Sequence, residues 1–181
     1  MSPVLAAPPP AAAHAEPRIV LRGAVSEVVD GDTVKVVVGR AETTVRLVGI
    51  DTPETRKPGT PVQCFGPQAS ARAAALMPVG GAVTVVTGPA QARYDRYRRL
   101  LAYVYRPGRR GPAGSVNFSL VASGHAKVYV YGGVRFRHAV AFFRAQHRAR
   151  KARRGLWGPP CDGDTDQPAR AASAAALPAQ S

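Results

Sequence analysis

Three consecutive runs of β-branched residues near the start of the chain limit its fold more than any other sequence feature. Residues 18–30, 32–40 and 42–51 each alternate apolar with polar side chains, and Asp-Gly and Gly-Arg-Ala turn signals separate them. This pattern predicts a three-stranded meander. Two further strand-like runs, at residues 82–88 and 100–106, bring the expected number of strands to five.

Helical segments interrupt and follow these strands. Residues 68–77 are rich in Ala and Leu, which predicts a helix between the third and fourth strands. A short helix is expected at residues 117–123 and a long one at 134–155. Five strands with a helix after the third indicate an α+β, mainly β, fold: an OB-type Greek-key barrel with about three helices. The apolar positions expected on the long helix are Phe136, Val140 and Phe143.

The two ends of the chain differ in composition from its centre. Residues 1–17 are rich in Ala and Pro and residues 161–181 in Ala and Asp, so we expect one globular domain at 18–160 between two disordered ends. Residues 13–15 are similar to a signal-peptide cleavage site, but no basic region precedes them. Residues 1–17 are therefore either the remnant of an incomplete signal peptide, with secretion as the expected localisation, or a plain disordered arm. No stretch approaches the roughly 18 apolar residues of a spanning helix, and no membrane partner is expected.

The chain has two cysteines, Cys64 and Cys161, which fit no Cys-x-x-Cys zinc spacing. In an exported protein they could join the loop before the first helix to the C-terminal end of the domain. The other interpretation is two unpaired thiols, and the sequence leaves both open.

The charge of the chain points to an anionic partner. The formal net charge is +14 and the pI is about 11.0, values that favour nucleic acid or an acidic membrane surface. Five of the eleven acidic residues nevertheless fall within 25 residues. A carboxylate pocket in a basic surface would repel phosphate unless a cation bridged the two, so the pattern indicates a metal-dependent nuclease. The five acids are Asp30, Asp32, Glu42, Asp51 and Glu54.

The second acidic pair of this window is better evidence for a metal than the first. Asp-Gly is a common turn signal, so Asp30-Gly31-Asp32 would also occur in an inert hairpin. A turn does not explain Asp51 and Glu54, which flank the rigid Pro53 at the end of a strand. Two carboxylates, a backbone carbonyl and waters make the oxygen shell that Ca²⁺ or Mg²⁺ requires. Two arginines, Arg46 and Arg99, are candidates for neutralising a phosphate beside such a cation.

Six segments, in this order and spacing, resemble the staphylococcal nuclease (thermonuclease) family: VDGDTVKV, RLVGIDTPET, FGPQAS, DRYRRLLAYVY, AKVYVY and GLWG. The similarity extends over about residues 18–158. It implies an OB-fold, Ca²⁺-dependent nuclease that cuts DNA and RNA and leaves 3′-phosphate ends, and we expect it to act as a monomer. The resemblance also implies that Asp32, Asp51 and the carbonyl of Thr52 ligate Ca²⁺.

The same resemblance implies roles for the remaining candidates. Arg46 and Arg99 would hold the scissile phosphate, and Glu54 would be the general base. Substrate contacts are implied for Arg96 and Tyr97 at a terminal phosphate and for Tyr129 and Tyr131 at the nucleotide pocket.

Two departures from the family pattern bear on these assignments. Arg98 replaces the glycine that usually precedes the catalytic arginine; the register with Leu-Leu-Ala-Tyr favours Arg99 for that role. The AKVYVY segment is one residue shorter than the family pattern, and an alternative for its tyrosines is packing on the core.

Three classes of function are compatible with a basic OB-type domain. A metal-dependent phosphodiesterase needs the acids and both arginines together, whereas a non-catalytic module that binds single strands needs only a basic groove and aromatic side chains. A scaffold that binds proteins needs neither. Because the whole set is present, the sequence favours the enzyme over the binding module.

Overall fold

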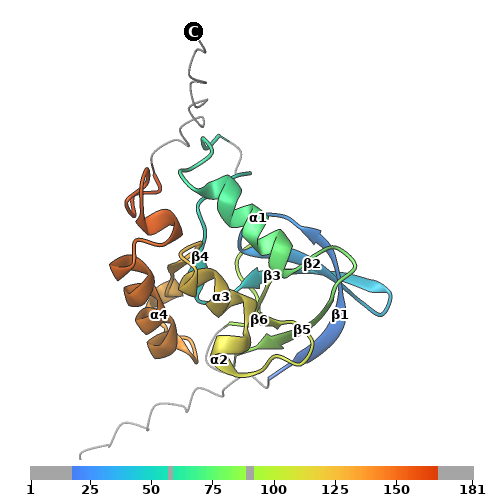
Figure 1. Ribbon diagram of the computed structural model, residues 1–181. Helices are drawn as coiled ribbons and strands as arrows, with labels where there is room; N and C mark the ends of the chain where they lie inside the picture. Colours follow the sequence, from blue (N-terminus) through green and yellow to red (C-terminus); the bar gives the residue numbers. More distant parts are fainter. Residues whose placement is uncertain (1–17, 57–58, 89–91, 167–181) are drawn as a thin grey trace, which may run out of the picture.

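Five strands form a closed barrel in this computed structural model, which describes residues 18–56, 59–88 and 92–166 (Figure 1). The order around the barrel is β1-β2-β3-β6-β5, with β5 returning to β1. Neighbouring strands are antiparallel except β3 and β6, which are parallel. The predicted five-stranded barrel is confirmed. Its strands are β1 (Val20–Val28), β2 (Thr33–Val38), β3 (Ala41–Leu47), β5 (Ala82–Thr87) and β6 (Leu100–Tyr105).

Helices cover one side of the barrel, and Figure 1 shows α3 between the barrel and α4. The expected helix after the third strand is present as α1, and α3 corresponds to the short helix expected near residue 117. No helix in the described part of the chain is long and apolar enough to cross a lipid bilayer. The helical segments are α1 (Gly66–Leu76), α2 (Gly111–Gly114), α3 (Val116–Ala122) and α4 (Ala139–Lys151), with 3₁₀ turns η1 (Tyr131–Gly133) and η2 (Gly155–Trp157).

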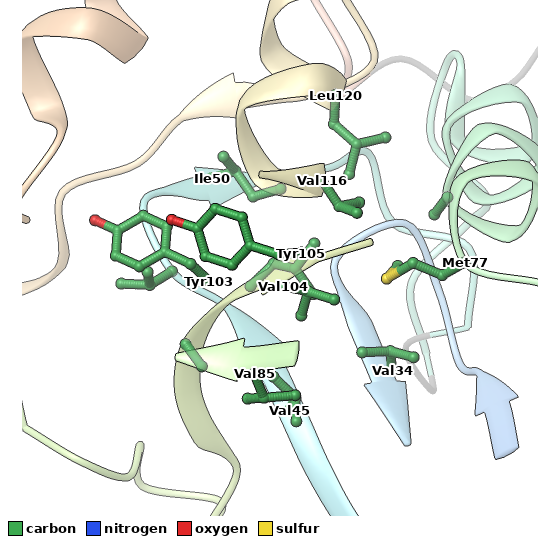
Figure 2. Packing of buried hydrophobic residues seen from close by; sticks show 14 of the residues in the cluster. Val34, Val45, Ile50, Met77, Val85, Tyr103, Val104, Tyr105, Val116 and Leu120 are labelled. Carbon is green, nitrogen blue, oxygen red and sulfur yellow. The ribbon is translucent and has the colours of Figure 1, made fainter. Parts of the chain in front are cut away.

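β-Branched side chains fill the barrel interior, as the alternating pattern predicts. Val34, Val45 and Val104 are fully buried there, and each such side chain contributes roughly 1.5–3 kcal/mol to folding. Figure 2 shows Met77, just after α1, and Leu120, from α3, beside the barrel residues. The helices therefore extend the same hydrophobic core that the strands begin.

The third predicted strand is shorter than expected, and the reason is Gly49. This residue has a φ of +80°, and a Cβ there would meet the ring of Phe136 at 2.6 Å. The chain turns at this point, so residues predicted to continue β3 form a separate strand, β4 (Ile50–Asp51), which pairs with β7 (Lys127–Val128). The turn brings the end of β4 to the side of the barrel where the acids gather.

The buried side chain of Asn117 fixes this turn. Its amide nitrogen donates to the carbonyls of Val48 at 2.9 Å and Ala102 at 3.1 Å, and its oxygen accepts from the backbone N–H of Val104 at 3.0 Å. Buried polar groups are stable only when they are hydrogen-bonded in this way. Helix α3 is thereby attached to the junction of β3, β4 and β6.

The long C-terminal helix differs from the prediction in its start and in its buried face. It begins at Ala139 rather than at residue 134, because Gly132 and Gly133 have φ angles of +58° and +74° and Phe136 is buried from a non-helical loop. Val140 and Phe143 are exposed, so the expected apolar face is wrong. The buried residues of α4 are Ala139, Phe142, Ala145 and Ala149.

Cys64 and Cys161 form a disulfide, with their Cα atoms 5.9 Å apart. It joins the residues just before α1 to the segment after η2. Residues 161–166, predicted to belong to the tail, are in the described part, and Cys161 and Thr165 are buried. The expected arm at 1–17 and the rest of the tail lie outside the described residues, so the domain boundaries stay predictions.

Candidate active site

Asp32 lies in the turn between β1 and β2 and is almost fully buried. Asp30 shapes this turn, because its Oδ1 accepts a hydrogen bond from the backbone N–H of Asp32 at 3.0 Å. The Oδ2 of Asp32 in turn accepts from the backbone N–H of Thr52 at 3.1 Å. Gly31 permits this approach, since a Cβ there would meet the Thr52 side chain at 2.6 Å. The two acidic segments of the sequence are thus held together.

Arg46 lies between the two candidate metal-binding carboxylates. Its Nη2 atom is 2.9 Å from Asp32 Oδ2 and 2.9 Å from Asp51 Oδ1, and its side chain is 13% exposed. Its Nη1 atom donates to the carbonyls of Leu47 at 3.1 Å and Ile50 at 2.8 Å. One guanidinium therefore holds the turn between β3 and β4 and neutralises part of the acidic charge.

Both carboxylates have raised pKa values. Burial raises the pKa of Asp32 to about 7; the nearby charges of Asp30 and Asp51 add to this, and Arg46 opposes it. Partial desolvation likewise raises the pKa of Asp51, with Arg46 opposing and the Glu54 charge adding to it. Arg46, with Lys127 acting on Asp51, thus leaves the pair short of positive charge, and a bound cation would favour the ionised form of both acids.

The donor set suits a hard cation. In the described ranges, no group of three or more His, Cys, Asp or Glu side chains is arranged to hold a metal ion. The candidate ligands are therefore the two carboxylates beside Arg46, together with the carbonyl of Thr52 and waters. Oxygen ligands with open positions fit Ca²⁺ or Mg²⁺ and not structural zinc.

The loop that begins at Glu54 is closed by Gln63. The backbone N–H of Glu54 donates to Gln63 Oε1 at 2.7 Å, and the backbone N–H of Gln63 donates to the Glu54 carbonyl at 2.9 Å. The amide nitrogen of Gln63 donates to Asp166 Oδ1 at 3.1 Å. Gln63 is followed directly by Cys64 of the disulfide, so the C-terminal end of this loop is fixed. The Glu54 Oε1 atom accepts backbone hydrogen bonds from Thr55 and Arg56, each at 3.0 Å.

Arg99 is held by a tight turn that begins at Asp95. Asp95 Oδ1 accepts from the backbone N–H groups of Tyr97 and Arg99, each at 2.9 Å, and Asp95 Oδ2 accepts from Arg99 Nε at 2.7 Å. Burial raises the pKa of Asp95, but the hydrogen bonds and charge of Arg99 outweigh this and lower it overall. Arg98 is exposed and has a φ of +61°, so an arginine here adopts the left-handed conformation that favours glycine.

Thr33 connects the two halves of the site. Its hydroxyl donates to Asp32 Oδ1 at 3.1 Å and accepts from Arg99 Nη1 at 3.3 Å. Arg46 lies on β3 and Arg99 directly precedes β6, the parallel neighbour of β3, in which Leu101 pairs with Arg46. The structure therefore brings Asp32, Asp51, Thr52, Arg46 and Arg99 to one place.

The four predicted substrate-contact residues are exposed. The Arg96 and Arg99 guanidiniums lie 4.8 Å and 5.2 Å from the centre of the Tyr97 ring. Tyr129 and Tyr131 are 47% and 55% exposed, with ring centroids 6.5 Å apart. These two side chains are available to stack on bases and do not fill the core.

Comparison with known proteins places these observations in a family. The model of the family described as "Staphylococcal nuclease homologue" matches residues 44–159. The chain belongs to the staphylococcal nuclease family. It is 34% identical over 143 residues to a micrococcal nuclease from Shigella flexneri, a match that covers 77% of this chain and 75% of that protein. It is 32% identical over 138 residues to a thermonuclease from Staphylococcus hyicus, covering 74% of this chain and 73% of the relative.

A further relative is longer than this chain. Endonuclease YncB from Bacillus subtilis (strain 168) is 42% identical over 104 residues, which are 57% of this chain and 46% of YncB. The match thus spans less than half of that protein.

Sequence reasoning missed three residues that hold this staphylococcal nuclease-type site in place: Thr33, Gln63 and Asp95. Asp95 lies four residues before Arg99, a spacing that indicates an ion pair in a helix, but this segment is a turn. Thr33 follows Asp32 directly, but nothing in the sequence indicates that it reaches Arg99. Gln63 had no signal, since its partners lie nine residues away at Glu54 and 103 residues away at Asp166.

Proposed function

We propose that this protein is a Ca²⁺-dependent nuclease that hydrolyses phosphodiester bonds of DNA and RNA and leaves 3′-phosphate ends. The observation that carries the proposal is the meeting of Asp32 and Asp51 at one nitrogen of Arg46. Family relatives named micrococcal nuclease and thermonuclease support the same reaction class.

The acids would bind the cation, and the arginines would bind the substrate. Asp32, Asp51 and the Thr52 carbonyl are the candidate ligands of Ca²⁺, which when bound would supply positive charge against the phosphate. Arg46 would then exchange its contact with the acids for a phosphate oxygen. Arg99, already directed toward Thr33, would bind a second phosphate oxygen, so that both guanidiniums stabilise charge developing on phosphorus.

Glu54 is the candidate general base. It would accept a proton from the attacking water, whose oxygen forms a new bond to phosphorus while the bond to the 5′ oxygen breaks. The departing 5′ oxygen takes a proton from solvent, and the phosphate stays on the 3′ end. The closed loop between Glu54 and Gln63 supports this role, because it limits the movement of the Glu54 backbone.

We also propose that the protein is secreted and acts as a monomer. The disulfide supports an oxidising compartment, where such bonds persist. Detection of the protein in culture medium and its elution volume in size-exclusion chromatography would test these two points.

The nuclease proposal is tested by incubating the protein with denatured DNA and with RNA in Ca²⁺, in Mg²⁺ and in chelator, and by measuring acid-soluble nucleotides. We expect cleavage in Ca²⁺ alone, 3′-phosphate ends on the products, and loss of cleavage in Asp51→Ala. Glu42→Gln is the matched control, because Glu42 is an exposed acid paired with Lys35 outside the site. DNA binding without cleavage under every metal would instead identify a non-catalytic binding module.

A further inference from the structure

A second basic surface lies away from the candidate active site, at the far end of β6. It is a groove of about 700 Å³ whose floor is β5 and whose sides are β1 and the loop after β6. We name it the distal groove. Five of its lining residues are arginines: Arg18, Arg22, Arg106, Arg109 and Arg110.

The arginines of the distal groove are exposed, and no acidic residue in the described part of the chain lines the groove with them. None of the described carboxylates lines the groove, and no ion pair joins any of its five arginines to another described residue. This differs from the active site, where Arg46 and Arg99 each contact a carboxylate. Guanidiniums that form no ion pair with a described carboxylate, placed on a concave surface, produce a positive field that attracts a polyanion.

The loop that carries three of these arginines has a fixed shape. Its first turn runs from Arg106 to Arg109, with a hydrogen bond from the Arg109 N–H to the Arg106 carbonyl at 3.1 Å and with Pro107 and Gly108 at its centre. Gly108 has a φ of +72°, as the third residue of a type II turn requires. A bridge between Tyr105 and Ser115 holds the base of the loop. The guanidiniums are therefore presented from a structured support.

The distal groove is separate from the active site along the strands. Arg46 pairs with Leu101 near the start of β6, whereas Arg106 follows the end of the same strand. Five residues at about 3.3 Å each place the two regions roughly 17 Å apart along β6. That length corresponds to about five duplex steps of 3.4 Å. A dinucleotide bound at the active site cannot reach the groove, but a longer strand can.

We propose that the distal groove binds the phosphate backbone of the nucleic acid substrate at a distance from the bond being cut. The groove is concave and carries arginines on two sides, so its shape fits a nucleic acid strand better than a flat anionic membrane. Arginine also binds phosphate in a bidentate geometry. The large exposed apolar side chain of the groove is Val20, so it offers little to insert into a bilayer. The inference rests on the proposed function for the identity of the polyanion.

The test compares two triple variants that lose equal charge. Arg106→Ala, Arg109→Ala and Arg110→Ala together alter the distal groove; Arg144→Ala, Arg148→Ala and Lys151→Ala alter the exposed side of α4. Binding to a fluorescent single strand of about 20 nucleotides is followed by anisotropy in chelator, across salt concentrations. Cleavage of that strand and of a dinucleotide is then measured in Ca²⁺.

We expect only the groove variant to lose affinity for the 20-mer. Each lost phosphate contact lowers the salt slope by about 0.7, so three contacts lower it by about 2. Between 50 and 200 mM salt, the wild type should therefore lose about sixteenfold more affinity than the groove variant. The groove variant should also show a raised KM for the 20-mer and unchanged kinetics on the dinucleotide.

Three outcomes would overturn the proposal. Equal losses in both triple variants would mean that net charge alone attracts DNA. Unchanged 20-mer binding in the groove variant would remove the groove from substrate recognition. If the groove variant lost the binding of wild type to phosphatidylserine vesicles but kept its DNA binding, the groove would be a membrane-binding surface. Because binding is measured in chelator, a groove effect without any cleavage in Ca²⁺ would support the groove and contradict the proposed nuclease activity.

Discussion

The two sides of the candidate active site are held in place by different means. Glu54 begins a loop that is closed by Gln63, nine residues later, and by the Cys64–Cys161 disulfide, whose cysteines are 97 residues apart. Arg99 is held by Asp95, four residues earlier in the same turn. One side therefore depends on the oxidation state and the C-terminal segment, and the other on the ionisation of a single carboxylate. Chemical treatments should disturb the two sides separately.

The largest effect should come from removing Arg99. Arg99→Ala should lower turnover by about 10³- to 10⁵-fold, because a guanidinium that neutralises charge in phosphoryl transfer has an effect of that size. Arg98→Gly is the matched control: it removes a neighbouring arginine and relieves the left-handed conformation at φ +61°. We expect its turnover to stay within about twofold of the wild type and its free energy of unfolding to rise by about 1 kcal/mol.

Steady-state cleavage of a dinucleotide in Ca²⁺ and urea unfolding would measure both variants. If Arg98→Gly abolished cleavage and Arg99→Ala did not, the assignment of the catalytic arginine from the register with Leu-Leu-Ala-Tyr would be wrong.

The second largest effect should come from removing the disulfide next to the Glu54 loop. Cys64→Ser with Cys161→Ser removes a link that closes a long loop, and the chain-entropy estimate for such a link is about 4–5 kcal/mol. The free energy of unfolding should fall by up to that amount. At a temperature where the variant stays folded, kcat should fall about tenfold, because the loop that begins at Glu54 is held less firmly. The KM for a dinucleotide should be unchanged. None of the residues proposed to contact the substrate lies between Glu54 and Cys64.

Gln63→Ala separates local positioning from global stability. It removes the side-chain contacts to Glu54 and Asp166 but leaves the disulfide in place. Its kcat should fall as in the cysteine variant with a smaller loss of stability. A cysteine variant that is less stable yet keeps full kcat would show that the disulfide supports the fold and not the position of Glu54.

Features that depend on local sequence patterns could be predicted, and features that depend on contacts between segments far apart in the sequence could not. Alternation of apolar and polar residues places Val34 and Val45 in the core, because side chains in a strand alternate between two faces. The acids and arginines of the site were identifiable because they lie in motifs. Gln63 was not, since its hydrogen bonds depend on a loop closure between distant segments. The end of β3 was also not predictable, because it depends on the packing of Phe136 against Gly49, where the chain turns.

The buried face of α4 shows a further limit of sequence reasoning. Phe142 and Phe143 are adjacent, and periodicity counted from Phe136 selects Phe143. Phe136 belongs to a loop, however, so the count began outside the helix and assigned the wrong face.

The smallest effect should come from the charge of Asp95. Burial would raise the pKa of this carboxyl in the folded protein, but the hydrogen bonds and charge of Arg99 lower it overall. A lowered pKa stabilises the fold at pH values above the unfolded pKa, and this contribution is lost as the pH falls through the folded pKa. Wild type should therefore be more stable than Asp95→Asn at pH 7, by no more than about 1 kcal/mol for a partly exposed pair.

Urea unfolding at pH 7 and near pH 3 would measure this difference. The difference in the free energy of unfolding between wild type and Asp95→Asn should be smaller in acid, where the carboxylate becomes protonated. The difference between wild type and the cysteine variant should be the same at both pH values, because a disulfide carries no charge. A gap for Asp95→Asn that is the same at both pH values would mean that hydrogen-bond geometry, and not ionisation, holds Arg99. In that case the Arg99 side would not respond to pH, while the Glu54 side would still depend on the oxidation state of the disulfide.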